Sequence, residues 1–205
     1  MSTAERVMRR FYRSSKGDPS KLPWHREEPA DLLIDTTHSL STGARVLDVG
    51  CGAGVFAVWM SSQGKQVTAI DLFPEAISMA QQRASQNGVD VTWVCADLFE
   101  FTPDAPYDLV FDSGCLHSLV GGQPSHYKEQ LLRWMAPEGV FVLEHWGKRH
   151  RIDWRPIGPR RRSPSQLASL FGPELKVDRV DENDFSAPLP FGPRVRGAAY
   201  RFSRT

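Results

Sequence analysis

The sequence has few cysteines, no long apolar run and no excess of charge of either sign. Its 205 residues contain only Cys51, Cys95 and Cys115, an odd number without a CxxC pair, which excludes a disulfide framework and a zinc-type spacing. No run approaches the ~20 apolar residues that span a bilayer, and residues 1–15 lack the apolar stretch of a signal peptide. A formal net charge of +1 gives no overall field that would attract nucleic acid or an anionic membrane. We therefore expect a soluble protein of a reducing, cytoplasmic compartment, without a metal, a membrane partner or a nucleic-acid partner.

What the sequence does contain, from residue 45 onward, is a regular alternation of short apolar runs with segments of helical periodicity. Strands are predicted at 45–49, 66–71, 91–97, 107–112, 139–146, 175–180 and 196–202. Helices are predicted at 54–63, 74–88 and 125–135, with Ser125 as the expected N-cap of the third. A fourth helix is expected after the capping box that Ser163 and Gln166 form. Because no helix separates the last two strands, we predict a Rossmann-like α/β fold. It has a seven-stranded, mostly parallel sheet with an antiparallel last hairpin and helices on both faces.

The first 44 residues precede this alternation. A possible capping box at Ser2 and Glu5 predicts a short helix through Tyr12, and a second helix is expected at about 29–40. We interpret residues 1–44 as a helical lid or cap segment and residues 45–205 as the main domain.

The segment RVLDVGCGAG, residues 45–54, is the most informative stretch. It ends a predicted strand with an acid, Asp48, and continues into Gly50, Gly52 and Gly54. Glycine permits positive φ and lets a ligand approach the backbone, and ligands of open parallel sheets bind at the carboxyl ends of the strands. A tight turn without a ligand is the plainer alternative, because a glycine-rich turn alone is a weak signal.

Acids at the ends of four successive predicted strands strengthen the case for a ligand. They are Asp48, Asp71, Asp97 and Asp112. Asp71 stands where a carboxylate accepts both hydroxyl groups of a ribose. The GxGxG spacing differs from the GxGxxG of dinucleotide folds, and an acid beside the loop would repel a pyrophosphate. The pattern therefore suits a nucleoside with a positive centre and an amino group.

VLDVGCGAG resembles motif I of the class I S-adenosylmethionine (SAM)-dependent methyltransferases. PW at 23–24, YDLVFDSGCLHSL at 107–119 and the GPRRRSP…FGPRV tail are similar to small bacterial thiol or thiopurine methyltransferase-like proteins. Many of those read DRGCLH in the second stretch, where this chain has Ser113 in place of the arginine.

The resemblance implies residue roles, SAM as cofactor and S-adenosylhomocysteine (SAH) as product. Asp48 and the backbone of Gly50, Cys51, Gly52 and Gly54 would hold the methionine part of SAM, covered by Trp24. Asp71 would bind the ribose with Leu72 beside the adenine, and Asp97 would accept from the adenine amino group with the Leu98 backbone nearby. Asp112 and Ser113 would line the position of methyl transfer, and residues 45–205 would be the methyltransferase domain.

Direct methyl transfer requires positioning of the reactants, and a proton acceptor where the methyl acceptor is an alcohol or a protonated amine. His117 is the expected catalytic base, beside Asp112. His145 is a second candidate, and each could instead be a hydrogen-bonded structural histidine. We expect Phe11, Tyr12, Trp24, Trp146 and Phe191 to contribute to an acceptor pocket, although each could be core.

The predicted acceptor is a small molecule, with sulfur favoured and nitrogen or oxygen of an aromatic or heterocyclic metabolite next. A noncatalytic SAM-binding protein is one alternative. An RNA methyltransferase using the basic run at 148–162 is another, although a solvated loop explains that run more simply given the near-zero net charge. A nucleotide-dependent oxidoreductase is the least favoured.

Overall fold

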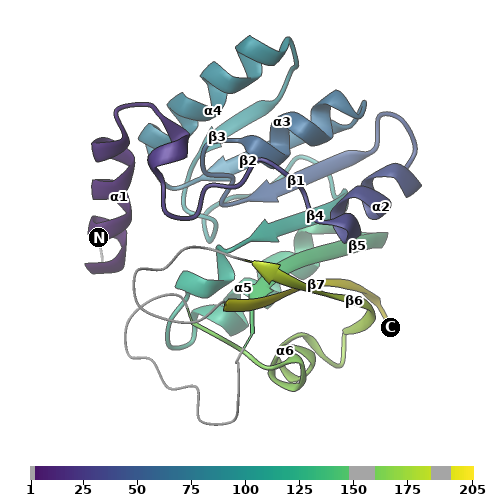
Figure 1. Cartoon of the computed structure of the whole chain (residues 1–205). Helices are drawn as coiled ribbons and strands as arrows, with labels where there is room; N and C mark the ends of the chain where they lie inside the picture. Colours follow the sequence, from purple (N-terminus) through teal and green to yellow (C-terminus); the bar gives the residue numbers. More distant parts are fainter. Residues whose placement is uncertain (1–2, 148–159, 186–194) are drawn as a thin grey trace.

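The computed structural model describes residues 3–147, 160–185 and 195–205. A seven-stranded sheet with the order β3-β2-β1-β4-β5-β7-β6 forms its centre (Figure 1). The strands are β1 (Arg45–Val49), β2 (Gln66–Asp71), β3 (Thr92–Cys95), β4 (Tyr107–Ser113), β5 (Met135–Trp146), β6 (Leu175–Phe185) and β7 (Val195–Arg204). The first five strands pair in parallel, and β7 runs antiparallel to both β5 and β6. The predicted fold class is therefore confirmed.

Helices cover both faces of this sheet. They are α1 (Thr3–Ser15), α2 (Asp31–Ser39), α3 (Val55–Ser62), α4 (Pro74–Asn87), α5 (Gln123–Trp134) and α6 (Pro164–Phe171), with 3₁₀ turns η1 (Pro19–Lys21) and η2 (Leu116–Ser118). Side chains of α2, α3 and α4 share one apolar cluster with the sheet, and side chains of α5 and α6 share another on the opposite face. Among the described residues, no helix has the length and apolar character needed to cross a bilayer.

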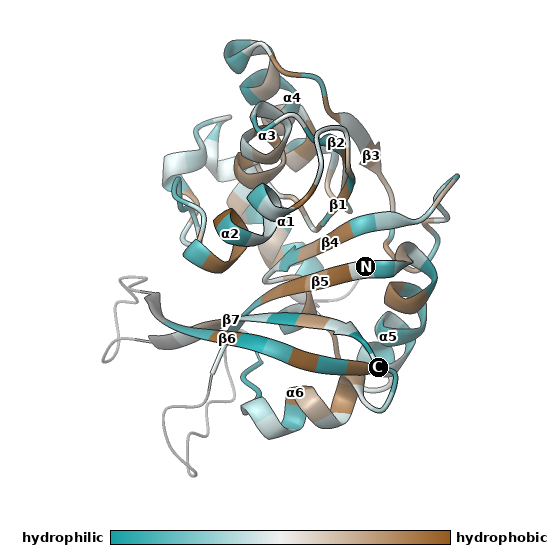
Figure 2. Cartoon of the chain, turned by 90° about the vertical axis from the view of Figure 1, so that its right-hand side faces the viewer, coloured by the Kyte–Doolittle hydropathy of each residue, from teal (hydrophilic) through white to brown (hydrophobic). Residues whose placement is uncertain are grey.

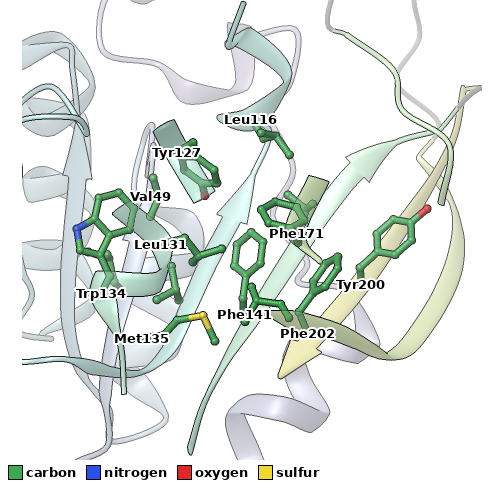
Figure 3. Packing of buried hydrophobic residues seen from close by; sticks show 14 of the residues in the cluster. Val49, Leu116, Tyr127, Leu131, Trp134, Met135, Phe141, Phe171, Tyr200 and Phe202 are labelled. Carbon is green, nitrogen blue, oxygen red and sulfur yellow. The ribbon is translucent and has the colours of Figure 1, made fainter. Parts of the chain in front are cut away.

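The larger core lies between the sheet and the pair α5 and α6. Aromatic side chains dominate it, with Phe141 of β5 packed against Phe171 of α6 and Phe202 of β7 at ring-centroid distances of 5.4 and 5.6 Å (Figure 3). Edge strand β6 alternates polar and apolar residues, as its mixed colours in Figure 2 show, whereas the centre of β5 is continuously apolar. This pattern follows from burial of central strands on both faces.

The chain reverses its direction of travel across the sheet at β1. It runs outward from β1 through β2 to β3 and then returns to place β4 on the other side of β1. The carboxyl ends of β1 and β4 thus form the topological switch point, where open α/β sheets bind their ligands. The loop that follows β1 carries Gly50, Gly52 and Gly54, as the prediction requires.

Several predicted boundaries are corrected. Helix α5 begins at Gln123 with Gly122 as N-cap, so Ser125 is not the cap; Pro124 suits the first helical turn because it needs no amide donor there. Strand β5 begins at Met135, earlier than expected, and β3 ends at Cys95, which leaves Asp97 in the following turn. Residues 148–159 of the basic run, which include Trp154, lie outside the described residues. The predicted pocket residue Phe191 lies outside them as well.

The N-terminal residues divide into two parts with different surroundings. Helix α2 belongs to the core, because Leu32 and Leu33 are fully buried and Leu33 packs in the α3 side cluster. Helix α1 instead lies over α4, where Arg9 and Arg13 both donate to Glu75, at 2.9 and 2.8 Å. Only α1 and η1 are therefore placed as a cover.

Candidate functional site

The glycine loop after β1 has a backbone that other residues would not adopt readily. Gly50, Gly52 and Gly54 have φ of 70°, 55° and 74°. A Cβ on Gly54 would lie 2.7 Å from the Cβ of Ala80 and 2.8 Å from Cη2 of Trp93. Glycine at this position therefore lets α3 begin directly against α4 and β3.

Asp71 joins the glycine loop to the end of β2. Its Oδ2 accepts the amide of Gly52 at 2.9 Å, and its Oδ1 accepts the amide of Phe73 at 2.9 Å. Burial raises the pKa of Asp71 to about 6, opposed by these backbone donors. Each oxygen retains a second lone pair, so the carboxylate can still accept hydroxyl groups. Leu72, which follows it, is 41% exposed and offers an apolar surface at the same edge.

Asp48 is the buried acid at the centre of the site. Only 2% of its surface is exposed, and Oδ2 has no hydrogen-bond partner among the described residues. Burial raises its pKa well above the usual value, with further contributions from the nearby carboxylates of Asp112, Asp71 and Glu144. A buried carboxylate oxygen without a donor is costly, and a cationic donor such as an ammonium group would satisfy it.

Asp97 and Leu98 lie in the turn after β3. The Asp97 side chain accepts the amide of Phe99 at 3.0 Å, so it shapes the turn as well as presenting a carboxylate. Both residues are half-buried, and Leu98 packs against the larger core.

Cys115, in the turn after β4, lies within the electrostatic influence of all four predicted acids. Burial raises the pKa of this thiol well above its usual value, and the carboxylates of Asp112, Asp71, Asp97 and Asp48 raise it further. Across the same space, the Cβ of Cys115 lies 3.0 Å from the position of a Cβ on Gly50. The glycine loop and the turn after β4 therefore lie against each other at the carboxyl edge of the sheet.

Asp112 differs from the other acids because both of its carboxylate oxygens accept hydrogen bonds from the turn after β4 or from α5. It is fully buried, and its oxygens accept the amides of Cys115 and Leu116 and the hydroxyl of Tyr127, at 2.7, 3.0 and 2.9 Å. Burial still raises its pKa to about 6. The side chain holds the turn after β4 against α5, so its contribution to the site is through the backbone that it fixes.

His117 is buried in the same turn. Its Nε2 accepts the amide of Trp146 at 2.7 Å, so Nε2 is unprotonated and the ring proton of the neutral form is on Nδ1. Burial lowers its pKa to about 3, helped by the positive charges of Arg162 and Arg161. In this arrangement the ring has no free lone pair with which to take a proton.

His145 of β5 packs on His117, with ring centroids 4.0 Å apart. It is fully buried, and neither ring nitrogen has a partner among the described residues. Burial lowers its pKa far below the usual value, and the neighbouring His117 and Arg162 lower it further. The two rings occupy the α5 side of the sheet.

Ser113 belongs to a hydrogen-bonded group with Glu144 and Arg26, two residues that the sequence patterns did not identify. Its hydroxyl donates to Oε2 of Glu144 at 2.7 Å, and the same oxygen accepts from the guanidinium of Arg26. An acid followed by a histidine in the otherwise apolar run at 139–146 was the available signal for Glu144. Arg26 lies in a loop and had none.

The N-terminal segment places aromatic side chains beside the glycine loop. Trp24 contacts Phe11 and Tyr12 edge-on, each at a ring-centroid distance of 5.6 Å. The Tyr12 hydroxyl lies 3.2 Å from where a Cβ on Gly52 would be. Burial raises the Tyr12 pKa well above its usual value, as does the charge of Asp71. The aromatic residues therefore lie directly over the glycine loop.

One other surface feature lies away from these residues. A hollow of about 340 Å³, lined by residues including Arg45, Thr68 and Asp90, is at the amino ends of β1 and β2, opposite the acids. Among the described residues, no group of three or more histidine, cysteine or acidic side chains is placed to hold a metal ion.

Comparisons with known proteins agree on one family. Residues 46–139 match the family model described as a methyltransferase domain. The chain is 37% identical over 89 residues to the ubiquinone biosynthesis O-methyltransferase of Xanthomonas euvesicatoria, covering 43% of this chain and 37% of that relative. The chain thus aligns with well under two thirds of the relative's length.

Solved structures extend the likeness to nearly the whole chain. A SAM-dependent methyltransferase from Aquifex aeolicus is 25% identical, with a TM-score of 0.64, and the match covers 92% of this chain and 95% of that one. The N-methyltransferase NodS from Bradyrhizobium japonicum, in complex with SAH, is 20% identical with a TM-score of 0.69 and 84% coverage of each chain. At that identity the second likeness concerns the fold.

Proposed function

This chain carries a class I SAM-dependent methyltransferase domain, and we propose from it that the protein transfers a methyl group from SAM to a small molecule and releases SAH. The observation that carries the proposal is the glycine loop at the carboxyl edge of the sheet, which is hydrogen-bonded to Asp71 and lies against Cys115 of the turn after β4. The orphaned Oδ2 of Asp48 supports it independently, because that oxygen lacks a hydrogen-bond donor and SAM has an ammonium group that would supply one.

The described residues fit SAM along its length. Asp48 would bind the ammonium group, beside the backbone of Gly50, Cys51, Gly52 and Gly54. Asp71 would accept the ribose hydroxyls, while Leu72 would pack on the adenine and Asp97 with the Leu98 backbone would meet its amino edge. Ser113 and the turn held by Asp112 would border the methyl end, and Trp24 would cover the methionine.

When bound, SAM supplies a methyl group already activated by its sulfonium. The protein is then required mainly to orient the acceptor and to exclude water. Trp24 and Tyr12 serve the second requirement, since they lie over the loop in the closed arrangement described above.

The acceptor is proposed to present sulfur, nitrogen or oxygen. The resemblance of residues 107–119 to thiol methyltransferase-like proteins favours sulfur, whereas the relatives named above act on oxygen and nitrogen by their names.

Calorimetry with SAM, SAH and NAD tests the cofactor assignment. We expect heat of binding with SAM and SAH and none with NAD. The methyl acceptor is then sought by incubating the protein with SAM and a panel of thiols, amines and phenols, and by mass-spectrometric detection of a one-carbon gain. Well-folded protein that binds neither SAM nor SAH would overturn the proposal, whereas SAH binding without any transfer would indicate a noncatalytic SAM-binding protein.

A further inference from the structure

Glu144 is a buried carboxylate with one oxygen fixed and the other free of any partner. It lies on β5 opposite Ser113 of β4, and 3% of its surface is exposed. Oε2 accepts from the Ser113 hydroxyl and from Arg26, while Oε1 has no hydrogen-bond partner among the described residues. Because buried polar atoms are nearly always hydrogen-bonded, the free Oε1 points to a donor that arrives with a ligand.

The position of Glu144 identifies which ligand. Across the carboxyl edge of the sheet the order of side chains is Asp71 of β2, Asp48 of β1, Ser113 of β4 and Glu144 of β5. We assign Asp71 to the ribose and Asp48 to the methionine, so Glu144 lies beyond the methionine end. Its charge nevertheless reaches Asp48, whose pKa it helps to raise. A donor bound at Oε1 is therefore the methyl acceptor rather than the cofactor.

Other candidate proton acceptors at this edge are less suited to the task. His117 has its Nε2 lone pair occupied by the Trp146 amide, and the Asp112 carboxylate accepts from three donors of the chain. His145 neighbours Glu144 on β5, so its side chain points to the opposite face of the sheet.

The same carboxylates make a proton acceptor necessary even for a thiol. Burial raises the pKa of Cys51 and of Cys115 well above the usual value, and the charges of Asp71 and Asp48 contribute at both. An acceptor thiol placed among these groups experiences the same burial and the same negative charges. Burial and negative charge raise the pKa of a thiol, so a group that takes its proton assists the transfer.

We infer that Glu144 is the proton acceptor of the methyl transfer, an inference that rests on the proposed function. As the acceptor atom forms its bond to the methyl carbon, the bond from that carbon to the sulfonium breaks and its electron pair stays on the sulfur. The S–H, N–H or O–H proton of the acceptor passes to Oε1 of Glu144 and later to solvent. Arg26 and Ser113 are positioning residues that hold Oε2 and leave Oε1 directed to the acceptor.

The test compares Glu144→Gln with wild type on two thiols of different acidity, benzyl mercaptan and 4-nitrothiophenol. Benzyl mercaptan needs its proton removed in the site, whereas 4-nitrothiophenol ionises unaided. We expect the variant to lose at least about 100-fold in kcat/KM with the first thiol, the ordinary contribution of a positioned base, and under about threefold with the second. With benzyl mercaptan the variant rate should rise about tenfold per pH unit below the pKa of the free thiol, because only pre-formed thiolate reacts.

Two variants and one binding measurement control the test. Glu138→Gln removes an exposed acid from the other end of β5 and should leave both rates unchanged. Glu144→Asp keeps the carboxylate and should recover part of the rate. SAH affinity by calorimetry should stay within about threefold of wild type in all three variants, which also establishes that they fold.

Each remaining outcome decides the inference. Equal losses on both thiols, unchanged rates in Glu144→Gln, or loss of its SAH binding would overturn the assignment of Glu144. So would wild-type protein that binds SAH but methylates neither thiol, nor benzylamine and phenol offered in parallel. Wild-type protein that does not bind SAH would instead overturn the proposed function itself.

Discussion

The amide of Gly52 donates to the carboxylate of Asp71 at 2.9 Å, and this bond ties the glycine loop of β1 to the end of β2. The two residues are far enough apart in the chain that only the parallel pairing of β1 with β2 brings them together. The bond fixes the position of the glycine loop relative to Asp71, the acid that we assign to the ribose. Asp48, beneath the loop, is left with the free oxygen that we assign to the ammonium group.

Asp48→Asn should weaken SAH binding without destabilising the protein. A hydrogen bond to a charged group contributes about 1.5–3 kcal/mol, so the loss of the carboxylate should cost roughly 10- to 150-fold in affinity. In the absence of ligand the substitution removes a buried charge that faces other carboxylates, so the free energy of unfolding should stay equal or increase. Calorimetry and urea unfolding measure the two quantities. The exposed Asp90→Asn is the control, and equal SAH affinity in Asp48→Asn would contradict the assignment.

Gly54→Ala should destabilise the protein strongly. The new methyl group would lie 2.7 Å from the Cβ of Ala80, and the residue would keep a positive φ. Overpacking and left-handed strain together are expected to cost about 3 kcal/mol or more of unfolding free energy. Gly88→Ala is the matched control: its φ is 64°, but nothing lies within 4 Å of the added Cβ. It should cost about 1–2 kcal/mol, and equal losses in the two variants would contradict the packing argument.

The succession of strands and helices, the antiparallel last hairpin and the site edge could be predicted from the sequence because they depend on local patterns. Apolar runs ending in an acid or a glycine locate the carboxyl ends of β1, β2 and β4 without any knowledge of tertiary contacts. Asp48 and Asp71 were found in this way, and both lie at the site.

The sequence could not predict where side chains point or which hydrogen-bond partners they have. Asp112 and Glu144 are both buried acids near strand ends. The first accepts from two amides of its own turn and from Tyr127 of α5, whereas the second keeps a free oxygen. This difference depends on the register of β4 with β5 and on Arg26 from a distant loop. No periodicity encodes such contacts, and the same limitation explains why the sequence left His117 open as either a catalytic base or a hydrogen-bonded structural histidine.

Buried histidine and aspartate give opposite dependences of stability on pH. The folded-state pKa of Asp112 is about 6, above its unfolded value, so its contribution to stability is lost as pH rises from about 4 to 6. The pKa of His145 is depressed in the folded state, so its contribution is lost as pH falls below about 6.5. The two effects oppose each other in wild type and are separated by substitution.

His145→Phe should therefore gain stability relative to wild type on acidification. The difference in unfolding free energy should move in favour of the variant by up to about 1.4 kcal/mol per pH unit below about pH 6. Asp112→Asn should show the opposite trend, its difference from wild type improving as pH rises from about 4 to 6. Urea unfolding at several pH values measures both, and difference curves with the same sign of slope would contradict the assigned pKa directions.

Cofactor binding should protect the N-terminal cover from proteolysis. Trp24 and Tyr12 lie over the glycine loop in aromatic contact, and Arg13, Lys16 and Lys21 offer trypsin sites in the same segment. SAH beneath these residues adds contacts that favour the closed arrangement, and cleavage through a local opening slows in proportion to the population that opens. We expect severalfold slower cleavage across residues 12–24 with saturating SAH, and weaker protection in Trp24→Ala. A model peptide digested with and without SAH controls for inhibition of trypsin. Unchanged cleavage in protein that calorimetry shows to be saturated would mean that α1 and η1 are a fixed part of the fold rather than a lid.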